Sequence, residues 1–485
     1  MDGGAIATDS WGPPMSLSSN AAQRAAGVSA PSAYSNKAAV RRLAGAPLEN
    51  THPSLITDGV AAEDRQLTVG RPFWVFFVLN TGIAPWLSGV IVAGMGLNLV
   101  QAALVIVLGS GLGAALPALT ALLGPQSGLS QIEAGRFAFG RVGNRLPAIL
   151  NWIGAIGWDV IFNSLSAAAI VALLGRYGLA SPLWAVFAAL VAVQLVIGAW
   201  GHHLIQSAAR WTGVALAVVF IAIGALALAK TGVPAANGPA AGSADVFAAL
   251  LLVVSFSITL APYASDYTRY LPRATPTGQV FASVFAGLFI ASVGFFGFGY
   301  ATASLVADPS PVGVMSALAN LAGPFAPVVL AAVALNSAPC NAVNDNSAAY
   351  CLISAGVRIS RPAATIAGAA LGFVACLMAT DSFVAFFENF LFLFAHGIAP
   401  WAAILIAHGL IAGGRPQQTP KGIGLGALVF VVVTAASIGL FSANSIYTGL
   451  LSSWVGGADI GPYLGFFVAG ALYALGFKAM QMRAA

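Results

Sequence analysis

Four polar residues lie on one face of a long apolar stretch, residues 325–355. Ser337, Asn341, Asn344 and Asp345 occupy positions i, i+4, i+7 and i+8 of a helix. Amide groups donate and accept hydrogen bonds, and a carboxylate can hold a cation or a proton. A single asparagine inside a membrane is more often a hydrogen bond between helices, but four such groups facing lipid would be very costly. The stripe therefore predicts a polar site inside the protein, with Asp345 neutralising sodium or carrying a proton.

The chain around this stripe is unusually apolar. Of its 485 residues, 59% are hydrophobic and 7% are charged, whereas soluble chains carry roughly 25% charged residues. This composition excludes a soluble enzyme and a nucleic-acid-binding protein. The three cysteines follow neither a disulfide nor a metal pattern, and the adjacent His202 and His203 are too sparse for a zinc site. We therefore expect a membrane protein that is not an enzyme and that holds no metal or cofactor.

Apolar stretches long enough to cross a bilayer recur from Phe73 onward, since about 20 residues are needed for each. They predict an all-α membrane protein with twelve transmembrane helices. Residues 1–70, rich in Ala, Ser, Pro, Asn and Gly, predict a disordered cytoplasmic tail without a secretory signal peptide. The predicted helices cover residues 73–94, 98–123, 147–175, 182–200, 208–229, 246–264, 279–303, 325–355, 363–380, 383–411, 422–442 and 461–479.

The basic residues predict how these helices are oriented. With both termini in the cytoplasm, 18 of the 20 Lys and Arg residues fall in cytoplasmic segments, and only Arg176 and Lys230 lie outside. Cytoplasmic loops of membrane proteins carry such an excess of basic residues. We therefore expect a multi-pass protein of the plasma (inner) membrane with both termini inside.

Two predicted helices are interrupted at corresponding places. Residues 83–86 (IAPW) in the first helix and 260–263 (LAPY) in the sixth lie 177 residues apart. Proline removes a helical donor, and Gly82 loosens the first helix further. Paired interruptions in the two halves of a chain indicate the midplane site of a transporter. The pattern predicts a five-plus-five inverted repeat over residues 71–412, with broken helices 1 and 6, followed by two additional helices in residues 413–485.

Three further ionisable residues lie in or beside predicted helices. Asp159 is rotated by about 100° from its neighbour Trp158, so we expect it to face an adjacent helix. Glu388 and His396 are two turns apart in the tenth helix. They are either paired with each other or near the outer surface.

Several motifs together resemble one known family. Over residues 65–412 the chain resembles the nucleobase–cation symporters of the NCS1 type, in the purine–cytosine permease branch. The resemblance implies the inverted-repeat fold shared with amino-acid symporters (the LeuT type), and import of a flat heterocycle driven by a sodium or proton gradient. The matching stretches are residues 80–89, 124–131 (GPQSGLSQ), Arg136, 139–140, Gly157-Trp158, 262–272 (PYASDYTRYLP) and 341–344 (NAVN).

The resemblance also implies roles for individual residues. Trp158 would be an aromatic platform for the heterocycle, and Asn341 and Asn344 would bind its hydrogen-bonding edge. In folds of this kind a sodium ion lies between carbonyls of the first helix and hydroxyls of the eighth, which suggests Ser337 as a ligand beside Asp345. The remaining residues expected to bind substrate are Asn80, Gly82, Phe162, Asn163 and Leu260.

This chain departs from the family pattern in the wall of that site. Leu260 stands where a second tryptophan is usual, and Phe162 stands where Asn or Gln is frequent, with Asn163 one residue later. A more aliphatic wall suits a ring other than cytosine or adenine. Allantoin, hydantoin and vitamin-precursor pyrimidines therefore stay open as substrates, as does an amino acid on the same fold. The expected partners are the heterocycle and the lipid bilayer, in a monomer or weak homo-oligomer, with no nucleic acid.

Overall fold

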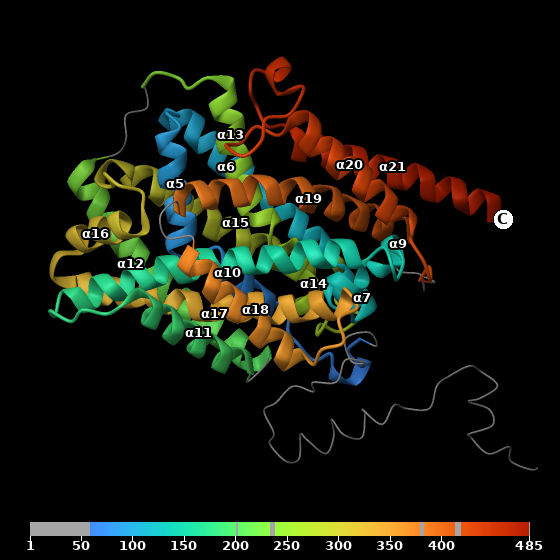
Figure 1. Ribbon diagram of the computed structural model, residues 1–485, viewed down its shortest axis with the longest axis horizontal. Helices are drawn as coiled ribbons and strands as arrows, with labels where there is room; N and C mark the ends of the chain where they lie inside the picture. The colour runs from blue at the N-terminus through green and yellow to red at the C-terminus, as the bar shows by residue number, and fades with distance from the viewer. Residues whose placement is uncertain (1–58, 200–201, 233–237, 379–382, 413–418, 485) are drawn as a thin grey trace, which may run out of the picture. The chain divides into compact units, whose positions relative to one another are not determined.

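The computed structural model describes residues 59–199, 202–232, 238–378, 383–412 and 419–484. In these ranges the regular elements are helices, as predicted (Figure 1). Most of the predicted tail, residues 1–58, lies outside the described residues. The principal helices are α4 (Gly70–Leu79), α5 (Ile83–Gly94), α6 (Leu99–Thr120), α10 (Arg145–Gly175), α11 (Leu183–Ala199), α12 (His202–Thr231), α13 (Ser243–Ile258), α15 (Thr277–Thr302), α17 (Ala326–Ser354), α18 (Arg361–Met378), α19 (Phe383–Ala412), α20 (Leu425–Phe441) and α21 (Gly461–Ala484).

The candidate membrane spans are consistent with the sequence. Among the described residues, 8 helices are long and apolar enough to cross a bilayer, and the bent pair α4–α5 makes up to 9. Three shorter apolar helices lie within α11, α18 and α20. This set is consistent with the predicted twelve spans. Helix α16 (Pro311–Ala322), which we did not predict, precedes α17. It begins at Pro311, and the Ser310 hydroxyl caps it by accepting from the Gly313 N–H.

The first span is broken where the sequence indicates. Helix α4 ends at Leu79, α5 starts at Ile83, and the two are bent by 53°. Gly82 joins them with φ 120° and ψ −152°, a conformation that residues with a side chain rarely adopt. Pro85 lies in the first turn of α5, where its missing N–H leaves no bond unmade. The break therefore follows from the local sequence.

The sixth span is broken at the corresponding place. Helix α13 ends at Ile258, a 3₁₀ turn follows (η2, Ala261–Tyr263), and α14 (Ala264–Thr268) continues the chain. Asn80 at the end of α4 donates to the Ser257 hydroxyl at 2.7 Å. These two residues are separated by 177 positions, the same offset that relates the two proline motifs. The two breaks thus meet at equivalent residues, as expected where a pseudo-two-fold axis relates two repeats.

Small residues let the helices beside the first break approach closely. Helix α15 packs against α4, α5 and α6, and α5 and α15 are closest at Gly89 and Gly299. A Cβ atom on Gly89 would lie 2.1 Å from the Phe296 carbonyl oxygen, and one on Gly299 would lie 1.9 Å from that of Trp86. Membrane helices commonly use small residues to bring backbones together. On the other side of the site, α10 packs along α17.

The packed region begins earlier than predicted. Residues 59–69, which we assigned to the tail, form hydrogen bonds with two distant segments. The Val60 N–H donates to the Gly128 carbonyl at 2.8 Å, and the Leu67 N–H donates to that of Tyr270 at 3.0 Å. The tail boundary at residue 70 is therefore too late.

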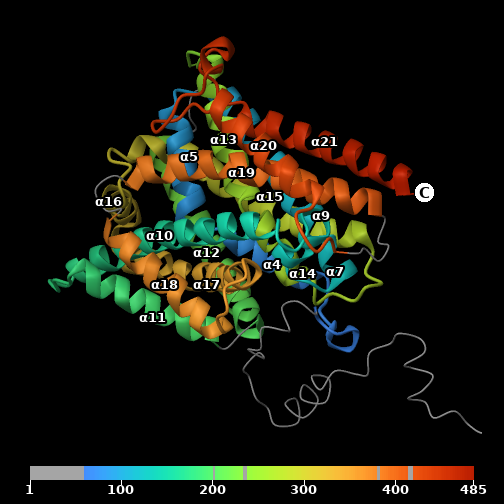
Figure 2. The same cartoon turned by 45° about the vertical axis from the view of Figure 1, so that its right-hand side comes forward.

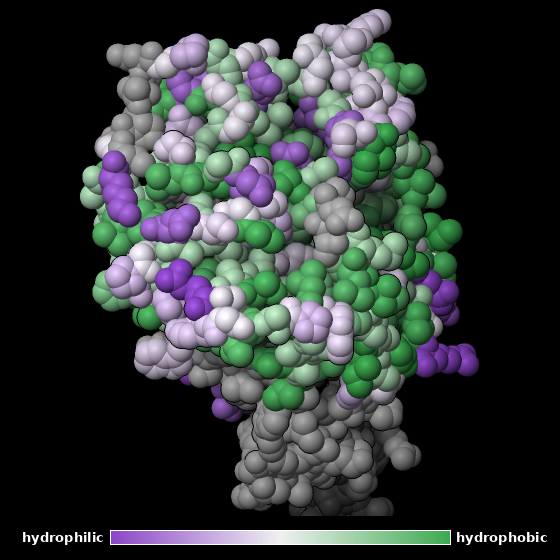
Figure 3. All heavy atoms as spheres, turned by 60° about the vertical axis from the view of Figure 1, so that its left-hand side comes forward, coloured by the Kyte–Doolittle hydropathy of each residue, from purple (hydrophilic) through white to green (hydrophobic). Residues whose placement is uncertain are grey.

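The last two helices attach through α19. Helices α20 and α21 pack against α19 and against each other (Figure 2). Large apolar side chains remain exposed along α6, α12 and α21, and Figure 3 shows such residues in green over a broad area of one face. On α6, Val100, Leu104 and Leu108 are 56–58% exposed at four-residue intervals. An apolar stripe of this kind is suited to contact with lipid.

Candidate substrate and coupling site

An aromatic box surrounds Trp158 in the middle of α10. The indole is 1% exposed and stacks on Phe162, with ring centroids 5.5 Å apart and an interplanar angle of 26°. Phe256 of α13 and Phe390 of α19 meet the indole edge-on, at 5.0 and 5.6 Å. Edge-to-face and offset packing at these distances are favourable. The indole Nε1–H has no hydrogen-bond partner among the described residues, so the box holds an unused donor.

The two helix breaks lie next to this box. Phe256, which touches Trp158, is followed by Ser257, which accepts from Asn80. Asn80 also donates to Ser292 of α15 at 2.6 Å, and its Oδ1 has no partner in the described structure. Leu260, which the sequence places where a tryptophan is usual, is buried in the same hydrophobic core as Trp158. The breaks therefore contribute one unused acceptor and an aliphatic wall.

Asn163, Asn341, Asn344 and Asp345, also predicted for the site, form a separate amide–carboxyl network between α10, α11 and α17. Asn163 and Asn341 both donate to Gln194 Oε1, at 3.3 and 3.2 Å. Gln194 Nε2 in turn donates to Asp345 at 3.1 Å. Asn344 donates to the Asn341 side-chain oxygen at 3.2 Å. All of these side chains are buried. In this structure the hydrogen bonds of Asn341 and Asn344 are therefore made within the protein.

Two members of this network were not among the predicted site residues. Asp159 does face neighbouring helices, as expected, and accepts from Asn344 at 3.3 Å. Its carboxyl also interacts with that of Asp345, the residue after Asn344. Gln194 is a single polar residue in an apolar helix, and no spacing in the sequence links it to a partner. The sequence signal for Asp159 is that it directly follows Trp158 in a helix. Adjacent helical residues point to different faces, so Asp159 had to meet a different neighbour from Trp158.

A third contact joins α17 to the break in the first span. Asn336 donates to the Thr81 carbonyl at 3.3 Å, and the Cys340 thiol faces the Val78 carbonyl at 3.9 Å. The Asn336 amide also abuts Gly82, where a Cβ atom would lie 2.7 Å from Nδ2. The Ser337 hydroxyl, suggested as a sodium ligand, is 3.5 Å from the Ala334 carbonyl of its own helix. Amide and thiol donors thus occupy the carbonyls of the first span.

A cavity of about 720 Å³ opens at the end of the bundle where α5 ends and α19 begins. Its lining includes Ile91 and Gly94 of α5, Tyr300 of α15 and Glu388 of α19. Trp158 is not in this lining because the box rings pack directly on one another. Helix α19 connects the two, since it carries Glu388 in the cavity lining and, two residues later, Phe390 in the box.

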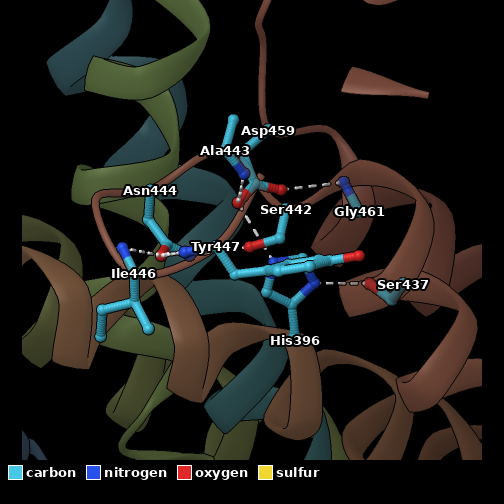
Figure 4. A network of polar contacts seen from close by, with 9 residues as sticks. All are labelled: His396, Ser437, Ser442, Ala443, Asn444, Ile446, Tyr447, Asp459 and Gly461. Carbon is cyan, nitrogen blue, oxygen red and sulfur yellow. Dashed lines mark hydrogen bonds and ion pairs between the residues drawn. The ribbon is translucent and has the colours of Figure 1, made fainter. Parts of the chain in front are cut away.

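His396 belongs to a different buried cluster (Figure 4). Its Nε2 lies 3.1 Å from Asp459 and its Nδ1 2.7 Å from the Ser437 hydroxyl. Asp459 also accepts from the Gly461 N–H at 3.2 Å. His396 is therefore paired with Asp459 and not with Glu388, which lines the cavity. The cluster joins α19 to α20 and to the segment that enters α21.

Comparison with known families decides which kind of protein carries this arrangement. Residues 60–421 match the family described as permease for cytosine/purines, uracil, thiamine, allantoin. The chain belongs to this family. The resemblance inferred from the sequence is therefore confirmed, and the protein is a multi-pass permease of the nucleobase–cation symport type.

Curated relatives and a solved structure agree with this assignment. The permease is 29% identical to the putative purine-cytosine permease YxlA of Bacillus subtilis, over 85% of this chain and 93% of that protein. It is 26% identical to the purine-cytosine permease FCY2 of Saccharomyces cerevisiae, over 81% and 79% of the two chains. The fold matches that of Mhp1, a nucleobase-cation-symport-1 family transporter in a closed conformation with bromovinylhydantoin bound, with a TM-score of 0.72 and 19% identity over 89% and 96% of the chains. This likeness confirms the predicted fold class.

Proposed function

We propose that this permease is a secondary active symporter that imports one planar, hydrogen-bonding heterocycle together with a cation. Membership of the permease family supports this function most directly. The substrate class fits the purine-cytosine relatives and the hydantoin-bound Mhp1 structure. The cation is sodium or a proton. The protein works in the plasma (inner) membrane, as a monomer or weak homo-oligomer with both termini in the cytoplasm.

The aromatic box supports the proposed place of the substrate. A flat ring that displaces Phe162 from the indole face would gain stacking with Trp158. Asn80 Oδ1 supplies an acceptor without a partner, and a ring N–H on the edge of a heterocycle matches it. Gly82 and Leu260, at the two breaks, complete the wall.

The network residues have a second proposed role. Asn341, Asn344 and Asn163 already hydrogen-bond each other, Gln194 and Asp159. To contact a ligand, Asn341 and Asn344 must exchange these bonds for bonds to the heterocycle edge. Such an exchange would couple substrate binding to Asp345. Substrate recognition and ion coupling would then share one set of side chains.

The cavity fits a route from one side of the membrane to the box. It lies between α5, α15 and α19, and α19 also contributes Phe390 to the box. Opening toward this side requires the ends of α5 and α19 to separate. Alternating access in this fold moves one group of helices against another around a fixed site.

Uptake by cells or proteoliposomes tests the proposed function. The panel contains labelled purines, pyrimidines, allantoin, hydantoins and amino acids, under imposed sodium or proton gradients. We expect uphill accumulation of at least one heterocycle and of no amino acid. Accumulation of amino acids alone would identify an amino-acid symporter on the same fold. Accumulation of no member of the panel would contradict the proposal.

A further inference from the structure

We propose that Asp159 and Asp345 form a buried carboxyl pair that holds one shared proton, and that this proton is the ion coupled to transport. The inference rests on the proposed symport function and specifies its driving ion. It assigns a role to Asp159, which the family resemblance does not single out.

Both acids are buried and lie next to each other. Asp159 of α10 is 2% exposed and Asp345 of α17 is 1% exposed. The two carboxyl groups are neighbours that interact with each other, and amide hydrogen bonds join Asp159 to Asn344 and Asp345 to Gln194. Two carboxylates this close in a dry interior cannot both be ionised, because mutual repulsion and lost hydration add together. At least one proton or cation must therefore accompany the pair.

The other described groups around the pair are uncharged. The donors to it are neutral amides, Asn344 to Asp159 and Gln194 to Asp345, while Asp345 Oδ1 has no partner. No Lys, Arg or His among the described residues forms an ion pair with either acid. The other titratable groups with an electrostatic interaction with Asp159 are Tyr263 of η2 and Cys376 of α18. Both are neutral when protonated, so no side chain that the structure describes supplies the missing positive charge.

The oxygen atoms around the pair suit a proton better than a sodium ion. A sodium ion needs several oxygen ligands that are free to turn toward it. Here the side-chain oxygens of Gln194 and Asn341 already accept from neighbouring amides. The alternative place for sodium, beside the first-span carbonyls, is occupied by the Asn336 amide against Thr81. A proton needs only the two neighbouring carboxyl groups.

The carboxyl pair is connected to the proposed substrate site. Asp159 follows Trp158 directly, and Asn344 and Asn341 link the pair to the face of α17 proposed to bind the heterocycle edge. When water from one side hydrates the pair, both carboxylates can be ionised, and the pair takes up the shared proton from that water. When water hydrates the pair from the other side, the pair releases the same proton to it. Reorientation of the amides between these states changes the groups offered to the substrate.

Accumulation by proteoliposomes provides the transport test, with a substrate identified by the uptake panel. At one proton per substrate, a gradient of one pH unit can drive roughly tenfold accumulation, since both correspond to the same free energy. We expect Asp159→Asn and Asp345→Asn to lose this accumulation while retaining substrate exchange across the membrane without a gradient. The proposal is wrong if both variants accumulate substrate as well as the parent, or if the parent responds only to sodium.

An infrared measurement tests the shared proton without any substrate. The parent should show the C=O stretch of a protonated carboxyl at neutral pH, and this band should be lost in Asp159→Asn and in Asp345→Asn. Asp266→Asn is a matched control, because this buried carboxylate accepts from the Gln131 N–H and the Ser347 hydroxyl; it should leave the band unchanged. A band that persists in both pair variants refutes the inference. If the Asn variants do not fold, Asp159→Glu and Asp345→Glu should keep the band. Absence of the band from the folded parent also refutes the inference. If the parent shows the band and the pair variants lose it, but no member of the uptake panel is transported, the symport function is refuted and the carboxyl pair is not.

Discussion

Replacing Trp158 tests the aromatic box most directly. The substitutions are Trp158→Phe, which keeps a ring face, and Trp158→Leu, which fills part of the volume without one. Stacking of a heterocycle on an aromatic side chain contributes about 1–3 kcal/mol per ring. The leucine variant should therefore raise the substrate Kd by roughly 5- to 150-fold, and the phenylalanine variant by less.

The same substitutions also remove contacts that stabilise the folded protein. The indole meets Phe162, Phe256 and Phe390, and each aromatic pair contributes about 0.5–1.5 kcal/mol beyond its buried area. Thermal stability will therefore fall together with affinity. Trp401 of α19 offers a matched control, because it is fully buried, has an unpaired Nε1 and belongs to a different hydrophobic cluster. Trp401→Leu should lower the Tm while leaving the Kd unchanged.

Equilibrium binding of labelled substrate to the purified permease, together with thermal unfolding, separates the two effects. We expect the order of affinities to be parent, Trp158→Phe, then Trp158→Leu, with Trp401→Leu equal to the parent. If Trp158→Leu binds substrate as tightly as the parent, the heterocycle does not stack on this residue. If the two leucine variants lose affinity equally, the effect of Trp158 is one of stability only.

Three further substitutions test the other parts of the site. Gly82→Ala would force a side chain into a positive φ and against Asn336, at a cost of about 1–3 kcal/mol, so transport and Tm should fall. Gly297→Ala, whose Cβ meets no atom within 4 Å in helix α15, should lower neither. Asn341→Ala should weaken substrate affinity by roughly 5- to 150-fold if its amide turns to the ligand edge; unchanged affinity with reduced Tm would make it a structural residue. His396→Ala should lower stability by about 1–3 kcal/mol, because Asp459 and Ser437 lose their buried partner; thermal unfolding measures this loss, and an unchanged Tm would contradict it.

The sequence by itself determined the kind of elements and the approximate position of the long apolar ones. Apolar runs of about 20 residues have one stable form in lipid, the helix, so the spans could be placed to within a few residues. The break in the first span was equally local, because Gly82 and Pro85 act on their own backbone. The motifs around Trp158 and at residues 262–272 carried the family resemblance, which the family match confirms.

Only the tertiary structure decided which side chains meet. The helical period places Asn341, Asn344 and Asp345 on one face, but it does not say which helix lies opposite. The opposing residues are Asp159 and Gln194, and nothing in their local sequence relates them to α17. Hydrogen bonds between helices depend on packing across more than 100 positions of the chain, as in the 151-residue separation of Gln194 and Asp345. The sequence thus supplied the polar groups, and helix packing selected their partners, because buried polar atoms must find one wherever the fold brings it near.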